Sequence, residues 1–205
     1  MKKIILSLTV LFAANALYAN LPMCADAVKD GAKHAQFKFD FDGNKKDEYF
    51  VLCEENGTVS AKVLNAKNKV LSSAAVQLPE TKGLSYSAAT NTNFNFGANK
   101  NIVVINAVTT GLSCRTESVT YLFYNKAKVL DSIYAPYLLG CPAESEETQL
   151  IFDTTTKSIL VYETKQKNIM VNGRNLLEEN TKKLTNIYTW DKNWDFAYPV
   201  TTEIK

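Results

Sequence analysis

The residues of this chain best suited to chemistry are the oxygen ligands of one short loop, Asp40-Phe-Asp-Gly-Asn-Lys-Lys-Asp-Glu48. A calcium loop places side-chain oxygens at positions 1, 3, 5 and 9 and a backbone carbonyl at position 7. These positions are held here by Asp40, Asp42, Asn44 and Glu48, with the backbone carbonyl of Lys46. The spacing predicts a calcium site. The alternative is an ordinary solvated turn, because turns favour Asp, Asn and Gly for conformational reasons.

The loop leads directly into an apolar stretch, Tyr49-Phe-Val-Leu52. From Phe39 to Leu52 the sequence resembles an FG-GAP (integrin-type) or VCBS repeat, in which an acidic loop precedes a hydrophobic strand. The resemblance implies a blade of a β-propeller and a loop that binds calcium. Lys45 stands where the loops of that family have a glycine, the residue that most readily allows a sharp turn.

Aromatic residues near the C-terminus form a second candidate site. Trp190 and Trp194 flank a turn and lie close to Tyr188, Phe196 and Tyr198. Exposed rings of this kind stack on sugars or bind a protein partner, whereas inward-facing rings fill a sheet core. The sequence leaves both interpretations open for Trp190 and Trp194.

No catalytic set can be assembled from the sequence. There is one histidine, His34, and there is neither a G-x-S-x-G motif nor a C-x-x-C motif. Pairs of carboxylates can be chosen among the 21 acidic residues, but no spacing singles one out. We therefore expect a binding protein rather than an enzyme, with a hydrolase that uses an unrecognised acid pair as a further alternative.

The first 19 residues predict a signal peptide, with Lys2 and Lys3 before a short apolar run and cleavage after Ala19. Loss of both lysines brings the formal charge of +2 to zero. A neutral chain without a basic run excludes electrostatic binding to nucleic acid. No other stretch is apolar over the length of a membrane span, so we expect an exported bacterial protein of the periplasm, or one released outside the cell.

Four cysteines in an exported chain predict two disulfides. Three pairings are possible. We favour Cys24–Cys53 and Cys114–Cys141, because each pair brackets one local segment of the chain.

Hydrophobic periodicity predicts an all-β fold. Phe37, Phe39 and Phe41 alternate with polar residues, as in a half-buried strand. Further strands are expected at 48–53, 58–64 and 70–76, after a short helix or loop over 20–35. Comparable patterns recur at a period of roughly 55 residues, in repeats over about 36–79, 93–136 and 149–198. We expect the acidic run 144–147 to form a loop between repeats.

The predicted architecture is a single all-β domain over residues 20–205. It contains about three antiparallel four-stranded meanders, arranged as a β-propeller-like fold or a sandwich and stapled by disulfides. The favoured function is a non-catalytic periplasmic binding protein, such as an inhibitor of a lysozyme-like cell-wall hydrolase, with a calcium-type loop. The alternative is a carbohydrate- or peptidoglycan-binding module that uses Trp190 and Trp194.

Overall fold

A computed structural model of the chain describes residues 20–77, 84–90, 100–109, 116–139, 144–153, 155–171, 174–190 and 196–197. The predicted signal peptide lies outside these residues, as do Cys114, Cys141 and Trp194. The backbone of Trp190 is described, but its side chain is not. No helix in the described ranges is long and apolar enough to cross a membrane.

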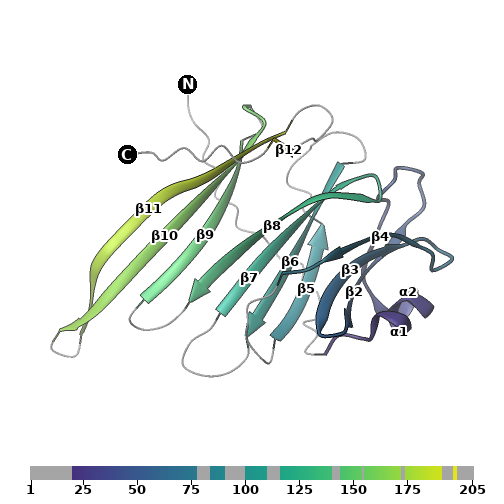
Figure 1. The fold of residues 1–205 in the computed structure, drawn as a ribbon, viewed down its shortest axis with the longest axis horizontal. Helices are drawn as coiled ribbons and strands as arrows, with labels where there is room; N and C mark the ends of the chain where they lie inside the picture. Colours follow the sequence, from purple (N-terminus) through teal and green to yellow (C-terminus); the bar gives the residue numbers. More distant parts are fainter. Residues whose placement is uncertain are drawn as a thin grey trace. The chain divides into compact units, whose positions relative to one another are not determined.

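The described chain is all-β, apart from two short helices near its N-terminus (Figure 1). The elements are α1 (Cys24–Lys29), α2 (Gly31–His34), β1 (Ala35–Phe39), β2 (Glu48–Glu55), β3 (Thr58–Leu64), β4 (Val70–Ala75), β5 (Leu84–Thr90), β6 (Lys100–Thr109), β7 (Thr116–Asn125), β8 (Lys128–Leu139), β9 (Glu144–Asp153), β10 (Ser158–Val171), β11 (Arg174–Trp190) and β12 (Phe196–Ala197). Strands that follow one another in sequence pair within three meanders, β1–β4, β5–β8 and β9–β12. The expected all-β fold of three four-stranded meanders is therefore confirmed.

The described residues divide into two compact units. One, here called the sandwich unit, holds both helices, β1–β6, nearly all of β7 and residues 128–134 of β8. The other, here called the hairpin unit, holds residues 135–139 of β8 and strands β9–β12.

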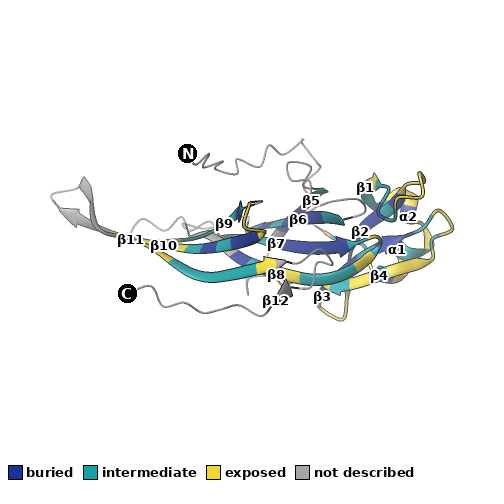
Figure 2. Ribbon diagram, turned by 90° about the horizontal axis from the view of Figure 1, so that it is seen from above, coloured by how far each residue is buried: buried dark blue, intermediate teal, exposed yellow. Residues whose placement is uncertain are grey.

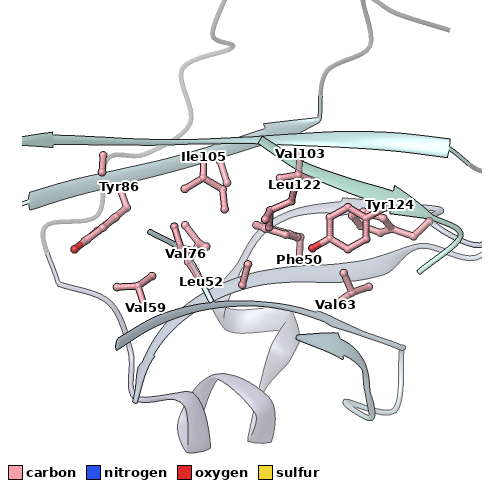
Figure 3. Close-up of a cluster of buried hydrophobic side chains, with 14 residues drawn as sticks. Phe50, Leu52, Val59, Val63, Val76, Tyr86, Val103, Ile105, Leu122 and Tyr124 are labelled. Atoms are coloured by element: carbon pink, nitrogen blue, oxygen red, sulfur yellow. The ribbon is translucent and has the colours of Figure 1, made fainter. Parts of the chain in front are cut away.

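The sandwich unit consists of two sheets packed face to face over one hydrophobic core (Figure 3). The first sheet contributes Phe41, Phe50, Leu52, Val59, Ala61, Val63 and Val76, and the second contributes Tyr86, Ala88, Val103, Ile105, Ala107, Leu122 and Tyr124. Along each strand these residues alternate with residues of the opposite face, which is the period-two pattern that a sheet requires. Of the two expected architectures, the sandwich describes this unit, and its two sheets do not close into a propeller ring.

Strand β2 is buried on both faces. Phe50 and Leu52 point into the sandwich core, whereas Val51 and Cys53 belong to a second cluster with Cys24 of α1. The two helices therefore cover the outer face of the first sheet at β2. This explains why β2 reads as a continuous apolar run rather than an alternating one.

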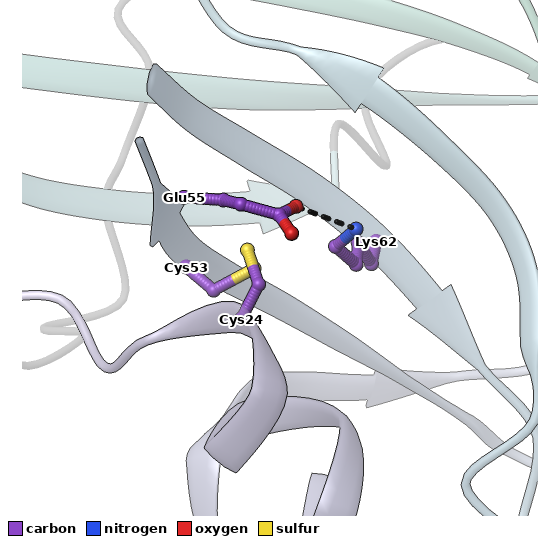
Figure 4. Close-up of a disulfide and its surroundings, with 4 residues drawn as sticks. All are labelled: Cys24, Cys53, Glu55 and Lys62. Atoms are coloured by element: carbon purple, nitrogen blue, oxygen red, sulfur yellow. Dashed lines mark ion pairs between the residues drawn. A yellow bond between two sulfur atoms is a disulfide. The ribbon is translucent and has the colours of Figure 1, made fainter. Parts of the chain in front are cut away.

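A disulfide between Cys24 and Cys53 joins α1 to β2, which confirms the first predicted pair (Figure 4). The predicted Cys114–Cys141 pair lies outside the described residues. Near the bond, Lys62 of β3 and Glu55 of β2 approach to 4.0 Å, and the Glu55 side chain is largely exposed. Such an exposed pair contributes little to stability, and it joins β3 to β2, whereas the disulfide joins α1 to β2.

The junction of the two helices is held against the β3–β4 turn. The Asn68 side chain accepts a hydrogen bond from the Gly31 N–H (3.3 Å) and donates one to the Lys29 carbonyl (2.9 Å). A Cβ at Gly31 would lie 2.7 Å from Leu64 Cδ1 and 2.9 Å from Asn68 Oδ1. A side chain at this position would therefore have to displace the Leu64 or the Asn68 side chain.

The hairpin unit is dominated by the long antiparallel pair β10–β11. Ile159 and Val161 of β10 are buried with Leu150 and Phe152 of β9, while Glu163 and the residues up to position 167 on β10 are mostly exposed (Figure 2). The expectation of a loop over 144–147 was wrong, because these residues form the first part of β9. They pair with residues 164–167 of β10, and Lys165 Nζ lies 2.8 Å from a Glu146 carboxylate oxygen. An exposed strand stretch can be rich in acids when its cross-strand neighbours are basic.

Candidate functional site

The candidate calcium ligands lie in the loop between β1 and β2. Strand β1 ends at Phe39 and β2 begins at Glu48, and these two residues are cross-strand partners. The sheet register therefore brings the first ligand position, Asp40, next to the last one, Glu48. Position 1 and position 9 of the loop meet because both ends of the loop are held by the same pair of strands.

The structure brings three of the predicted ligands together. One carboxylate oxygen from each of Asp40, Asp42 and Glu48 lies within 4.8 Å of the others. Calcium–oxygen distances of roughly 2.3–2.6 Å allow two ligands to lie at most about 5 Å apart across the ion. The three oxygens are therefore close enough to share one calcium ion.

Hydrogen bonds within the loop fix the two aspartates. The Asp40 carboxylate accepts the backbone N–H groups of Gly43, Asn44 and Lys45 at 2.8, 3.0 and 2.9 Å. The Asp42 carboxylate accepts the backbone N–H of Asn44 at 3.0 Å and its side-chain amide at 2.8 Å. The chain thus wraps around Asp40, with its N–H groups directed at the first ligand.

The other two predicted ligands, Asn44 and Lys46, follow this wrap. The Asn44 side-chain oxygen accepts the Lys46 N–H at 2.8 Å, and both residues are exposed. An amide oxygen has two lone pairs, so this bond leaves Asn44 able to accept a second partner. Lys46 lies two residues before Glu48, in the exposed part of the loop.

Lys45 adopts the turn conformation that its position requires. Its φ is +67°, in the left-handed region that favours glycine, and φ of Gly43 is +77°. A side chain in this region costs about 1–2 kcal/mol. The hydrogen bond from the Lys45 N–H to the Asp40 carboxylate offsets that cost, together with the bonds that Gly43 and Asn44 donate to the same carboxylate. The lysine in place of glycine therefore does not prevent the sharp turn.

Phe41, between the two aspartates, ties the loop to the sandwich core. Its side chain is 0% exposed, and its ring lies 5.3 Å from the ring of Phe39 and 5.1 Å from that of Tyr124. Its backbone N–H donates a 2.8 Å hydrogen bond to Glu48 Oε2. The sequence predicted the apolar face of Phe41. It gave no sign of the bond to Glu48, which arises only when the strands pair.

Glu48 is the electrostatically unusual member of the group. It is 3% exposed, and burial raises the pKa of its carboxyl. The Phe41 N–H opposes this effect, whereas the negative charges of Asp42 and Asp40 raise the pKa further. Among the described residues no ion pair involves any of the three acids. A bound cation would stabilise the ionised form of all three.

The second candidate site cannot be assembled in the same way. The backbone of Trp190 lies in β11 opposite Phe196 of β12, at the end of the last meander. Trp194 and the side chain of Trp190 lie outside the described part. The sugar-binding interpretation of these residues therefore stays a prediction.

Comparison with known proteins gives no relationship. No protein-family model matches the chain, and neither curated proteins nor solved structures give a significant match.

Proposed function

We propose that the protein is a non-catalytic binding protein of the periplasm, and that its β1–β2 loop binds a calcium ion. Asp40, Asp42, Asn44 and Glu48 would supply side-chain oxygens, and Lys46 would supply its carbonyl. The observation that carries this proposal is the approach of three carboxylates to within 4.8 Å in a loop held at both ends by paired strands. The loop's resemblance to FG-GAP and VCBS calcium loops supports the same assignment.

We further propose that the loop is a contact surface for a protein partner, namely a lysozyme-like cell-wall hydrolase. Residues 43–47 are exposed, while Phe41 and Glu48 on either side of them are buried. An exposed loop with fixed ends loses little conformational entropy on binding, which favours entry into the cleft of another protein. A calcium ion would stiffen it further and reduce its negative charge.

Calcium titration by calorimetry, on the mature protein with its disulfides formed, tests the metal site. Asp42→Asn keeps the shape of the side chain and removes one charged ligand, so we expect at least a tenfold loss of calcium affinity, about 1.4 kcal/mol. Asp47→Asn is the matched control, because Asp47 is exposed in the same loop and does not belong to the carboxylate group. If the wild type gives no heat of calcium binding, the metal site is refuted. It is also refuted if Asp42→Asn and Asp47→Asn bind calcium with the same affinity.

The partner is tested separately. We expect the mature protein to lower the activity of a lysozyme-like hydrolase in a 1:1 complex, more strongly with calcium than with a chelator. The Asp42→Asn variant should lose the calcium effect. Calcium binding without any effect on hydrolases would leave the metal site standing and remove this partner.

A further inference from the structure

The tip of the β2–β3 hairpin carries a modification motif that the calcium loop does not use. It reads Asn56-Gly57-Thr58, an asparagine followed two residues later by a threonine, with no proline between them. This is the acceptor motif for N-linked glycosylation of exported proteins. Asn56 is the only asparagine of the sequence that meets this requirement. The motif therefore indicates one position and one class of modification.

The hairpin tip is open to an enzyme. Residues 54–58 are all exposed, and a Cβ built on Gly57 meets no atom within 4 Å. The side-chain amides of Asn44 and Asn68, in two other turns, donate hydrogen bonds within the protein. The Asn56 amide has no such bond to any residue that the structure describes. Its nitrogen is therefore free to act as an acceptor.

The conformation of the tip allows it to open locally. Asn56 and Gly57 have φ of +51° and +75°, as in a two-residue type I′ turn, and Glu55 pairs with Thr58 at its base. The buried part of β2 ends at Cys53, before the exposed stretch begins. The tip can therefore open without disturbing the core of the sandwich unit.

The disulfide next to the motif agrees with modification after export. Cys53, which is bonded to Cys24, lies three residues before Asn56. Structural disulfides form in the oxidising compartments that exported proteins enter, and N-linked glycans belong to secreted proteins. The inference that follows rests on the proposed export of the chain and is independent of the calcium site.

We propose that Asn56 is an N-glycosylation site, to which an oligosaccharyltransferase transfers one oligosaccharide from a polyprenyl diphosphate donor. Nδ2 of Asn56 attacks the anomeric carbon of the first sugar, and a C–N bond forms. The bond between that carbon and the diphosphate oxygen breaks, and the lipid diphosphate leaves with the electron pair. One amide proton passes to a base of the enzyme, so the glycosylated side chain is uncharged.

A glycan at this position would leave the calcium loop open. Glu48 and Glu55 are the two ends of β2, about 23 Å apart along an extended strand. The glycan would instead lie close to Met23, which forms a bridge with Glu54 and is 55% exposed, the largest value among the described large hydrophobic residues. A bulky, soluble group there would shield this apolar side chain.

Intact-mass and peptide mass spectrometry test the site. The full chain is produced in a bacterium that carries an oligosaccharyltransferase for this motif and a lipid-linked oligosaccharide of known mass. We expect the mature protein to gain the mass of one oligosaccharide, on the peptide that contains Asn56. Asn44 is the internal control and should stay unmodified, because it is also exposed but is followed two residues later by Lys46.

Three variants separate the acceptor from the hydroxyl that the motif requires. Asn56→Gln and Thr58→Val should each lower the modified fraction at least about tenfold. Thr58→Val keeps the β-branched shape at an exposed strand position, so we expect it to fold. Thr58→Ser keeps the hydroxyl and should stay modified. The Cys24–Cys53 bond, read from the mass without reductant, reports that each variant was exported and folded.

An exported, disulfide-bonded wild type without the oligosaccharide would overturn the proposal. So would a Thr58→Val variant that is modified like the wild type, or a glycan on Asn44 in place of Asn56. Production of residues 20–205 behind the leader of a known periplasmic protein keeps a failure of the natural leader distinct from a failure of Asn56. Calcium titration of the unmodified protein is a separate measurement, so the two sites can fail independently.

Discussion

The ring of Phe41 packs 5.1 Å from the ring of Tyr124, at an angle of 58°. Phe41 lies in the acidic loop after β1 and Tyr124 lies on β7, in the other sheet of the sandwich. The contact therefore links the candidate calcium loop with the far side of the core. The loop is shaped by the packing of the sandwich as well as by its own hydrogen bonds.

Tyr124→Phe should stabilise the protein. The Tyr124 side chain is fully buried, and among the described residues its hydroxyl has no hydrogen-bond partner. Burial also raises the pKa of this phenol, so it stays neutral at all physiological pH values. An unpaired buried hydroxyl costs about 1–3 kcal/mol, and its removal keeps the ring contact with Phe41. We expect the free energy of unfolding in urea to rise by about 1 kcal/mol.

Tyr86→Phe is the matched control for this prediction. Its ring belongs to the same core, but its hydroxyl lies at the margin of the cluster (Figure 3). We expect a smaller change in stability. A loss of stability in Tyr124→Phe would mean that the hydroxyl has a favourable partner.

Glu48→Gln should stabilise the calcium-free protein at neutral pH. The folded-state pKa of Glu48 is raised above its usual 4.5, first by burial. A group with a raised pKa makes its favourable contribution below the unfolded-state pKa and loses it as pH rises through the folded-state pKa. Wild-type stability should therefore fall as pH rises above about 4.5. The glutamine variant lacks this loss, and its amide can donate to the neighbouring aspartates.

Urea unfolding of both proteins with a chelator, across this pH range, measures the difference. The two should be alike in acid and diverge toward neutral pH, with the variant more stable. The opposite order at neutral pH would show that the Glu48 charge is favourable in the folded state. Added calcium should stabilise only the wild type.

Gly31→Ala should destabilise the protein. The new methyl group would lie 2.7 Å from Leu64 Cδ1 and 2.9 Å from Asn68 Oδ1, so these side chains or α2 itself must shift. Overpacking of this kind costs about 1–3 kcal/mol. Gly57→Ala is the control: nothing lies within 4 Å of its new Cβ, and only the positive φ of +75° opposes it. A Gly31→Ala variant as stable as the wild type would show that the Leu64 and Asn68 side chains make room for the methyl group.

Removal of the Cys24–Cys53 disulfide should lower stability by roughly 3–4 kcal/mol, from the chain-entropy effect of closing a loop between residues 29 apart. Cys24→Ala/Cys53→Ala keeps both positions apolar in the cluster that they share with Ala27 and Leu64. The midpoint of urea unfolding gives the change. A variant as stable as the wild type would mean that packing alone holds α1 on β2.

The first meander could be predicted closely from sequence. The expected strands 48–53, 58–64 and 70–76 agree with β2, β3 and β4 to within two residues at each end. There, the alternation of apolar and polar residues, the Asn56-Gly57 turn and the apolar run of β2 all predicted the same strands. The first disulfide was also the pairing favoured from the sequence, because Cys24 and Cys53 bracket one local segment of the chain.

The long hairpin and β5 were less predictable. Apolar periodicity stops near Tyr162, yet β10 continues to Val171, because cross-strand charge pairs such as Lys165 with Glu146 support an exposed stretch. β5 begins at Leu84, ahead of the repeat expected from residue 93, and its serines and alanines carry no strong strand signal. The spacing of the candidate ligands in the loop could be predicted from the sequence. The burial of Glu48 could not, because it depends on packing between distant segments.

Strand β2 is paired on both sides and covered on both faces, by the helices and by the second sheet. Its amide protons can therefore exchange with solvent only when the sandwich unit opens as a whole. Protection of β2 in a deuterium-exchange experiment should then report the global unfolding free energy. Strands at the sheet edges should exchange through smaller, local openings.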